Sequence, residues 1–195
     1  MDIRIRLADW RDHATVQPLR RQLPRLVDGG LWELLNWAMY HVHTAIVGDR
    51  VVGYTSVALL DNGMADDVGT FVEPEYRNQG VASRLRYTQL RDLAVMGWTH
   101  FYVAVVRDQT VAIDMCRALM GEPVTLAYPD EPLYFGGPVF TVAAKLKDMN
   151  VPLPHPLGPK HLDRLKVKGE KARQELIQLA DMANFSMAKV MARGI

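Results

Sequence analysis

The chain has 195 residues, 49% hydrophobic and 23% charged, and 23 Lys and Arg residues nearly balance 22 Asp and Glu residues. This composition excludes a disordered or low-complexity chain, and a net charge of +1 supplies no overall field that would draw the protein to nucleic acid or an anionic membrane. The single cysteine, Cys116, excludes an internal disulfide framework and a Cys-rich zinc site.

The first part of the chain predicts a strand and then helices. Residues 3–7 alternate apolar and basic side chains, the period of a half-buried strand. Residues 14–26 are typical of a helix, or of a helix pair interrupted near Pro24. Residues 31–39 again place Leu, Ala and Met at helical spacing.

A hairpin and a further strand come next. Residues 44–47 and 51–60 are rich in β-branched side chains and flank a Gly48-Asp49-Arg50 turn, which predicts a hairpin. Residues 68–72 predict another strand, which Pro74 ends.

Helices and strands alternate over the following segment, and this order favours an α+β, or mixed α/β, fold. A helix opens after Arg77 and runs to about Met96, where Gly97 stops it. We expect further elements as follows: a central strand at residues 101–106, a helix at 108–120, and closing strands at 124–128 and 139–146 around a bend rich in Pro and Gly.

The last part of the chain differs in composition. We expect a domain over residues 1–147, then a Pro-rich linker over 148–159, because residues 151–159 hold four prolines. A helical tail follows over 160–195, with eight basic and four acidic residues and an apolar stripe of Ala172, Leu176, Leu179, Ala183, Met187 and Val190. This stripe must be buried, either on its own domain, on a second copy of the chain or on a larger partner.

The most informative segment joins the strand at 68–72 to the helix that follows Arg77. A glycine turn that enters a helix leaves the first backbone N–H groups without intrahelical partners, and these groups with the helix dipole form an anion site. Gly80 and Ala82 are small enough for phosphate oxygens to approach the main chain, and Arg77 adds a charge at the rim. The same pattern also suits an ordinary turn into a surface helix.

The surrounding pattern resembles the GCN5-related N-acetyltransferase (GNAT) family. Its pyrophosphate signature, Q/R-x-x-G-x-G/A, is matched by Arg77, Gly80 and Ala82 between a strand and a helix. The element order is similar over residues 1–147, and the motif-level resemblance covers 66–121. The resemblance implies a central mixed, mostly antiparallel sheet flanked by helices, to which this chain adds its C-terminal helical extension.

The resemblance also implies where acetyl-CoA, the expected cosubstrate, would bind. The strand at 68–72 would splay from the strand at 101–106, and the pantetheine arm would pair with the main chain of Phe71 and Val72 like an extra strand. The pyrophosphate would lie on a run of backbone amides, with Arg77 beside it: Asn78, Gln79, Gly80, Val81, Ala82 and Ser83.

In the family an acceptor amine attacks the thioester directly, and a base removes its proton. The resemblance places that base on Asp66 or Asp67, with Asp66 the better match to the family position. Solvated charges at a strand start are the alternative for both. If the two carboxylates are close and partly buried, the pKa of one of them rises.

The family's acid is a tyrosine on the helix after the second strand, and this chain departs from that pattern. The position falls on Cys116 or on Arg117, depending on the alignment. Water, Tyr128 or Tyr134 remain as alternatives for the acid. Cys116 is a candidate covalent nucleophile, although a mid-helix cysteine is more often inert packing.

A pair of histidines and a set of tryptophans each have a functional and a structural interpretation. His41 and His43 have the i, i+2 spacing of one strand face, but without a third ligand nearby in the sequence we favour a structural role, and we expect no metal. Trp10, Trp32 and Trp37 either line an acceptor pocket or belong to the core.

The sequence thus predicts an acetyl-CoA-dependent N-acyltransferase that moves an acetyl group to a primary amine, on a small molecule or a protein, in a ternary complex. The alternative is a GNAT-fold protein with impaired catalysis that serves as a binding or structural component through its C-terminal helix. We expect a cytoplasmic protein, because its first residues are unlike a signal peptide and no stretch is apolar enough for a membrane span. Assembly through residues 160–195, as a homo-oligomer or in a larger complex, is a further expectation, whereas nucleic acid is not an expected partner because no binding motif accompanies the basic residues.

Overall fold

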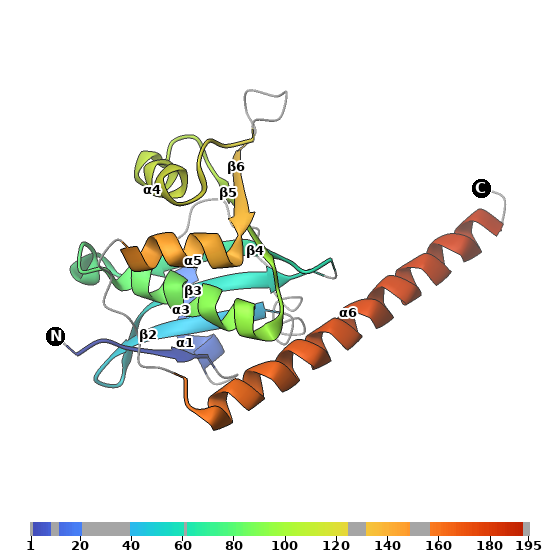
Figure 1. The fold of residues 1–195 in the computed structure, drawn as a ribbon, viewed down its shortest axis with the longest axis horizontal. Helices are drawn as coiled ribbons and strands as arrows, with labels where there is room; N and C mark the ends of the chain where they lie inside the picture. The colour runs from blue at the N-terminus through green and yellow to red at the C-terminus, as the bar shows by residue number, and fades with distance from the viewer. Residues whose placement is uncertain are drawn as a thin grey trace.

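The computed structural model describes residues 2–8, 12–20, 40–60, 62–124, 132–148 and 157–192. Within these ranges the chain forms one six-stranded sheet with helices around it (Figure 1). The strands are β1 (Arg4–Leu7), β2 (Tyr40–Val47), β3 (Arg50–Leu59), β4 (Met64–Val72), β5 (His100–Val105) and β6 (Leu133–Pro138). The helices are α1 (His13–Arg20), the short 3-10 helix η2 (Pro74–Tyr76), α3 (Val81–Met96), α4 (Thr110–Met120), α5 (Val139–Asp148) and α6 (Pro159–Ala192).

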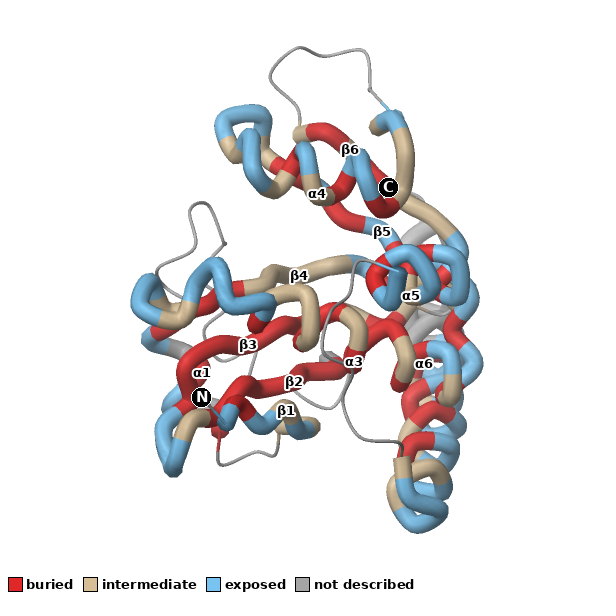
Figure 2. The backbone as a smooth tube through the Cα atoms, turned by 60° about the vertical axis from the view of Figure 1, so that its left-hand side comes forward, coloured by how far each residue is buried: buried red, intermediate tan, exposed pale blue. Residues whose placement is uncertain are grey.

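The sheet follows the order of the chain, and its pairs are antiparallel except for the parallel pair β4–β5. The expected mixed, mostly antiparallel sheet is therefore confirmed. β4 and β5 run parallel because α3 connects them by crossing back over the sheet. β2 and β3 are buried along most of their length (Figure 2), as expected for central strands that are covered on both faces.

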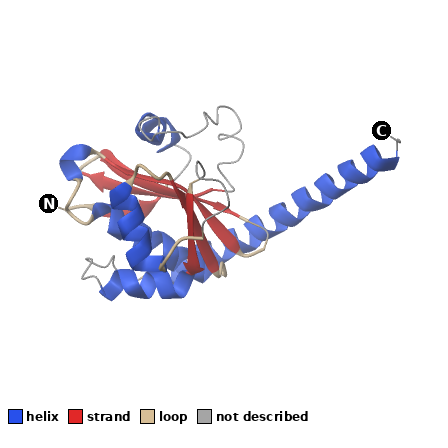
Figure 3. Ribbon diagram, turned by 90° about the horizontal axis from the view of Figure 1, so that it is seen from above, coloured by secondary structure: helices blue, strands red, loops and turns tan. Residues whose placement is uncertain are grey.

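Side chains that alternate along the strands form separate clusters on the two faces of the sheet. Ala45 and Val72 pack with Leu85 of α3, whereas their chain neighbours Ile46 and Phe71 pack with residues of α1. In the view from above, helices lie on both sides of the sheet (Figure 3). This arrangement fixes the orientation of α3, whose N-terminus reaches the end of β4.

β4 and β5 separate along their length. They pair only at their beginnings, from Met64 opposite His100 to Asp66 opposite Tyr102. At this point β4 also carries a bulge, because Ser56 of β3 faces Gly69 while Val57 faces Asp67, which leaves Val68 as the extra residue. The bulge bends β4 away from β5 and opens the sheet, and the separation of the two strands is the one that the family resemblance implies.

The prediction of a strand at residues 139–146 is wrong, because these residues form helix α5. Val139, Val142 and Leu146 recur at steps of three and four and are buried in the main core cluster, so their apolar pattern has the period of a helix. The last strand, β6, instead spans the segment expected to be a bend. Its Gly136 is required by packing, since a Cβ there would lie 2.5 Å from the ring of Tyr102. Val124 makes only an isolated bridge with Tyr134.

The N-terminal half of α6 packs against the domain. Leu165, Ala172 and Leu176 are buried in the same cluster as residues of α3 and α5. Gly169 allows a close approach to α3, because a Cβ there would lie 2.8 Å from the carbonyl oxygen of Met96. The packed core therefore continues beyond residue 147, and the C-terminal half of α6 extends away from the domain (Figure 1).

The other expected elements are confirmed, with shifted ends, wherever the structure describes them, apart from the strand at 124–128, of which only Val124 is described. None of the helices described is long and apolar enough to cross a membrane. Several expectations lie outside the described residues: the helix at 31–39, the end of the helix at 14–26, the linker residues 151–156, Tyr128, Trp10, Trp32 and Trp37.

Candidate functional site

The space between the separated strands is a cavity of about 670 Å³. Residues Val68 to Val72 of β4 line one wall, Val103 to Val106 of β5 and its following loop line another, and the start and inner face of α4 close it. Arg77 and Ala82 lie at one end of the cavity. The expected splay of the two strands thus creates a site of the size of a small-molecule binding pocket.

The turn between β4 and α3 exposes backbone donors. Asn78 (φ 60°) and Gly80 (φ 73°) both adopt left-handed conformations, and Gly80 is the N-cap of α3. The first intrahelical hydrogen bond runs from the amide of Arg84 to the carbonyl of Gly80, at 3.0 Å. Within the described part of the chain, no amide from residues 78–83 donates to another backbone group, so these donors can receive an anion.

Arg77 is held over the cavity by two contacts. Its Nε donates to the carbonyl oxygen of Val72 at 2.9 Å, and its guanidinium lies 5.7 Å from the centre of the Phe71 ring. The amide of Glu73 donates to Val52 of β3, and in a trans peptide the Val72 carbonyl points the opposite way, toward the cavity. Arg77 is thus anchored beside the predicted pantetheine strand, and neither Nη atom has a hydrogen-bond partner among the described residues, so both can reach a phosphate.

Asp67 lines the cavity, but its carboxylate is already engaged. Arg86 of α3 donates to both oxygens, from Nη1 at 2.9 Å and Nη2 at 2.7 Å, and the amide of Gly69 donates to Oδ1 at 3.2 Å. The side chains of Asp67 and Arg86 are both more than nine-tenths buried. A carboxylate held in this way is a fixed part of the bulge in β4 rather than a free base.

Asp66 differs from its neighbour. It is exposed and is not among the described residues that line the cavity. Desolvation by the surrounding protein raises the pKa of the Asp66 carboxyl, and the nearby charge of Asp67 adds to this effect. The expectation that one of the two carboxylates has a raised pKa is therefore met by Asp66, which forms no ion pair with a described residue and accepts a backbone hydrogen bond from Asp67.

The position expected for an acid carries no tyrosine. Cys116 is buried and lines the cavity, and burial raises the pKa of its thiol to about 11. Arg117 is exposed and paired with Glu122 and Asp114. Tyr134 is half-buried on β6 and is not among the described lining residues. The described part of the site therefore presents no tyrosine hydroxyl to a departing thiolate.

Arg86 was missed by the sequence analysis. It lies four residues after Ala82 and four before Leu90, so the helical period places it on the buried face of α3. A charged residue within an apolar helix face was the available signal, because a buried arginine requires an acidic partner.

A comparison with protein families identifies the chain. The model of the acetyltransferase (GNAT) family matches residues 5–121, and the chain belongs to this family. It is accordingly an N-acetyltransferase of the GNAT type. No curated protein sequence matches significantly.

Solved structures share the fold. An acetyltransferase of the GNAT family from Staphylococcus aureus Mu50 has a TM-score of 0.61 at 12% identity, over 71% of this chain and 99% of the other. An N-acetyltransferase from Thermoplasma acidophilum, determined in complex with coenzyme A, has a TM-score of 0.58 at 12% identity, over 71% and 99%. The diaminobutyrate acetyltransferase from Paenibacillus lautus, determined with L-2,4-diaminobutyric acid and coenzyme A, has a TM-score of 0.55 at 17% identity, over 71% and 96%. None of these comparisons supports the alternative of a binding component with impaired catalysis.

Proposed function

We propose that the protein transfers the acetyl group of acetyl-CoA to a primary amine by direct attack within a ternary complex. The observation that carries the proposal is the run of amides at residues 78–83, which have no backbone acceptor among the described residues and adjoin the cavity between β4 and β5. Anion donors beside an open strand edge suit a ligand with a pyrophosphate and an extended amide-containing arm. Structures similar in fold that contain coenzyme A support the same choice of cosubstrate.

In this proposal the pyrophosphate lies on the amides of residues 78–83, with Arg77 as a charged partner. The pantetheine arm follows β4 at Phe71 and Val72, where the edge no longer pairs with β5. Its amide groups would share the Val72 carbonyl with Arg77, since a carbonyl oxygen has two lone pairs. The bulge at Val68 leaves main-chain groups of β4 outside the hydrogen-bonded pairing of β3 with β4, next to where the thioester would lie.

The transfer itself needs one proton acceptor and one donor. The amine nitrogen attacks the thioester carbon, forms a tetrahedral oxyanion that backbone N–H groups stabilise, and expels the thiolate of coenzyme A. Asp66 is the proposed base, acting directly or through a water molecule, because its carboxyl is exposed and has a raised pKa. Asp67 positions the bulge through Arg86 and Gly69. Water is the proposed donor to the thiolate, since the described site offers no tyrosine hydroxyl.

The binding part of the proposal is tested by thermal unfolding with and without acetyl-CoA. A ligand that binds only the folded state raises Tm, by roughly 5–10 °C at a concentration one hundred times its Kd. Gly80→Trp blocks the amides and removes this shift. Gly48→Trp is the matched control, since Gly48 also has a positive φ and open space around its Cα, but lies in the β2–β3 turn.

A wild-type protein whose Tm does not respond to acetyl-CoA, or a Gly80→Trp variant that responds as the Gly48→Trp control does, overturns the cofactor site. The catalytic part is tested by measuring free thiol released from acetyl-CoA across a panel of peptide α-amines, lysine, small amines and aminoglycosides. Release that depends on the amine supports direct transfer. Release of thiol without acetylated amine contradicts it.

A further inference from the structure

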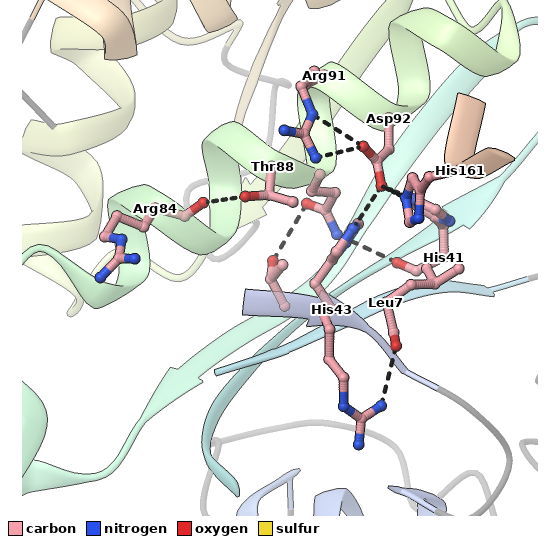
Figure 4. A network of polar contacts seen from close by, with 11 residues as sticks. Leu7, His41, His43, Arg84, Thr88, Arg91, Asp92 and His161 are labelled. Atoms are coloured by element: carbon pink, nitrogen blue, oxygen red, sulfur yellow. Dashed lines mark hydrogen bonds and ion pairs between the residues drawn. The ribbon is translucent and has the colours of Figure 1, made fainter. Parts of the chain in front are cut away.

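A second constellation lies on the opposite side of the sheet from α1, between β2, α3 and α6 (Figure 4). His41 and His43 point from the same face of β2 toward Asp92 of α3, which is 49 residues from His43 in the sequence. The Nε2 atoms of His43 and His41 lie 2.8 Å and 3.7 Å from Oδ2 of Asp92. The fold therefore brings to the two histidines the third ligand that the sequence lacks nearby.

His41 is buried without a hydrogen bond to either ring nitrogen. Its side chain is fully buried, and both Nδ1 and Nε2 lack a hydrogen-bond partner within the described structure. Leaving such a group unsatisfied in the interior is costly. A metal ion that accepts the lone pair of one ring nitrogen at this position would remove part of that cost.

The donor atoms of the cluster suit a cation. His41, His43 and Asp92 each offer one ligand atom, and these atoms all lie within 4.8 Å of one another. All three side chains are buried. Imidazole nitrogen and carboxylate oxygen are common ligands of transition-metal ions.

A fourth donor comes from α6. Nε2 of His161, in the first turn of that helix, lies 4.0 Å from the same Oδ2 atom, and the side chain is 39% exposed. A tetrahedral zinc site with bonds near 2.0–2.1 Å separates its donor atoms by about 3.3 Å. The observed separations of 2.8, 3.7 and 4.0 Å from the carboxylate oxygen lie on either side of that value, so each of these three distances needs to change by less than an ångström.

The cluster is also reachable. His43, Asp92 and His161 line a cavity of about 600 Å³ that is bounded by β1 and by Leu157 and Gly158 ahead of α6. An ion can enter through this cavity and complete its coordination with water from it.

We propose that His41, His43 and Asp92, completed by His161, bind a divalent transition-metal ion of the zinc class. This inference is independent of the proposed acetyl transfer. Imidazole-rich sites select Zn²⁺, Co²⁺ or Ni²⁺, whereas Mg²⁺ and Ca²⁺ require several oxygen ligands. The neighbouring cations Arg91 and Lys168 repel any divalent ion, so imidazole ligation rather than negative charge must supply the binding, which favours the zinc class over hard cations.

The ion would act on the structure rather than on the acetyl group. Asp92 lies twelve residues after Gly80 along α3, which is about 18 Å at 1.5 Å per residue. His41 and His43 are not among the described residues that line the acetyl-CoA cavity. An ion held by β2, α3 and α6 instead ties the C-terminal helix to the domain, so it is expected to protect residues 159–176 from amide hydrogen exchange.

The test uses the full chain without a polyhistidine tag, freed of metal by a chelator and titrated with Zn²⁺ in competition with a chromophoric chelator. Wild-type protein is expected to bind a single ion, to gain Tm, and to give the intense visible absorption of four-coordinate Co²⁺ when Co²⁺ replaces Zn²⁺. Asp92→Asn and His43→Ala abolish binding. His161→Ala, at a half-exposed position where folding is preserved, weakens it by roughly 10–100-fold. His100→Ala, an exposed histidine on β5, is the control and leaves the affinity unchanged.

Zn²⁺ is expected to slow amide exchange in residues 159–176 of the wild type but not of His161→Ala. This result separates the proposed site from binding at the surface. Wild-type protein that binds no Zn²⁺, or that binds it as tightly after His161→Ala as before, overturns the proposal. A Co²⁺ spectrum typical of six-coordination that is lost in the His100→Ala control would place the ion on the surface at His100, and this result overturns the proposal as well. If Asp92→Asn does not fold, the His161→Ala measurement decides the question alone.

Discussion

Arg86 of α3 and Asp67 of β4 form a buried pair in which both guanidinium Nη atoms bond to the two carboxylate oxygens, at 2.9 and 2.7 Å. The guanidinium also lies 4.8 Å from the centre of the Phe101 ring on β5. One side chain therefore touches both strands at the point where they begin to separate. This pair connects the anion-binding helix to the bulge that opens the cavity.

Replacing Arg86 by Met is expected to destabilise the fold by about 3–5 kcal/mol, because it leaves the Asp67 charge buried without its partner. The quantity to measure is the free energy of unfolding in urea. The double change Arg86→Met with Asp67→Leu is expected to recover much of the loss, since no buried charge remains. Arg117→Met, at an exposed site, is the control, and an Arg86→Met protein as stable as this control contradicts the prediction.

Replacing Asp66 by Asn is expected to lower kcat by roughly 10²–10⁴-fold, the usual contribution of a general base. The wild-type rate should rise with pH through the raised pKa of Asp66, and the variant should lose that rise. Asp49→Asn in the β2–β3 turn is the control. A pH–rate profile unchanged by Asp66→Asn would remove Asp66 from the proposed mechanism.

The same substitution has an expected effect on stability. Since the folded-state pKa of Asp66 is raised, the folded protein loses stability relative to the unfolded chain as pH rises through that pKa. Asp66→Asn should therefore melt at a higher temperature than wild type at pH 7 and at a similar temperature below about pH 3, where both forms are neutral. Thermal unfolding followed by circular dichroism at the two pH values checks the sign.

Cys116 is expected to be inert. With a pKa of about 11, fewer than about one thiol in a thousand is ionised at pH 7.5. Cys116→Ala should retain the wild-type kcat, and the native protein should react with iodoacetamide far more slowly than the unfolded one. Loss of acetyl transfer in Cys116→Ala together with a trapped acetyl-cysteine would show instead that the thiol is a covalent nucleophile.

The N-terminal half of α6 is expected to be required for folding. A chain that ends at residue 158 loses the burial of Leu165 and Leu176, each worth about 1.5–3 kcal/mol, and should unfold at much lower urea. A chain that ends at residue 181 retains these contacts and should stay close to wild type. Sedimentation of the chain that ends at residue 181, compared with the full chain, tests whether residues 182–195 are needed for assembly. Equal stability of the two truncated chains would contradict the packing of the N-terminal half of α6.

Lys168 is expected to reduce stability near neutral pH. Burial lowers its pKa to about 8, so between pH 8 and about 10.4 the unfolded chain binds more protons and stability rises with pH. Lys168→Met should therefore be more stable than wild type at pH 7, with an advantage that shrinks toward pH 10. Unfolding in the presence of a metal chelator measures this difference. A constant advantage across the pH range would show that only packing has changed.

Local patterns determined much of this protein. The turn at residues 73–83 is contiguous, so its glycine, its arginine and the helix that follows are visible in the sequence. The GNAT resemblance and the sheet class depend on such local features, and both are confirmed. The misjudged segment at 139–146 shows the limit, because a short apolar run has no unambiguous period until α3 buries one side of it.

Only the tertiary structure decided which distant groups meet. The pairing of Arg86 with Asp67 spans 19 residues, and that of His43 with Asp92 spans 49. Neither separation corresponds to a repeat of a helix or strand, so no pattern along the chain indicates it. The crossover of α3 between two separating strands sets both contacts, and burial then gives the side chains their chemistry, since desolvation shifts the pKa of His41 and Cys116.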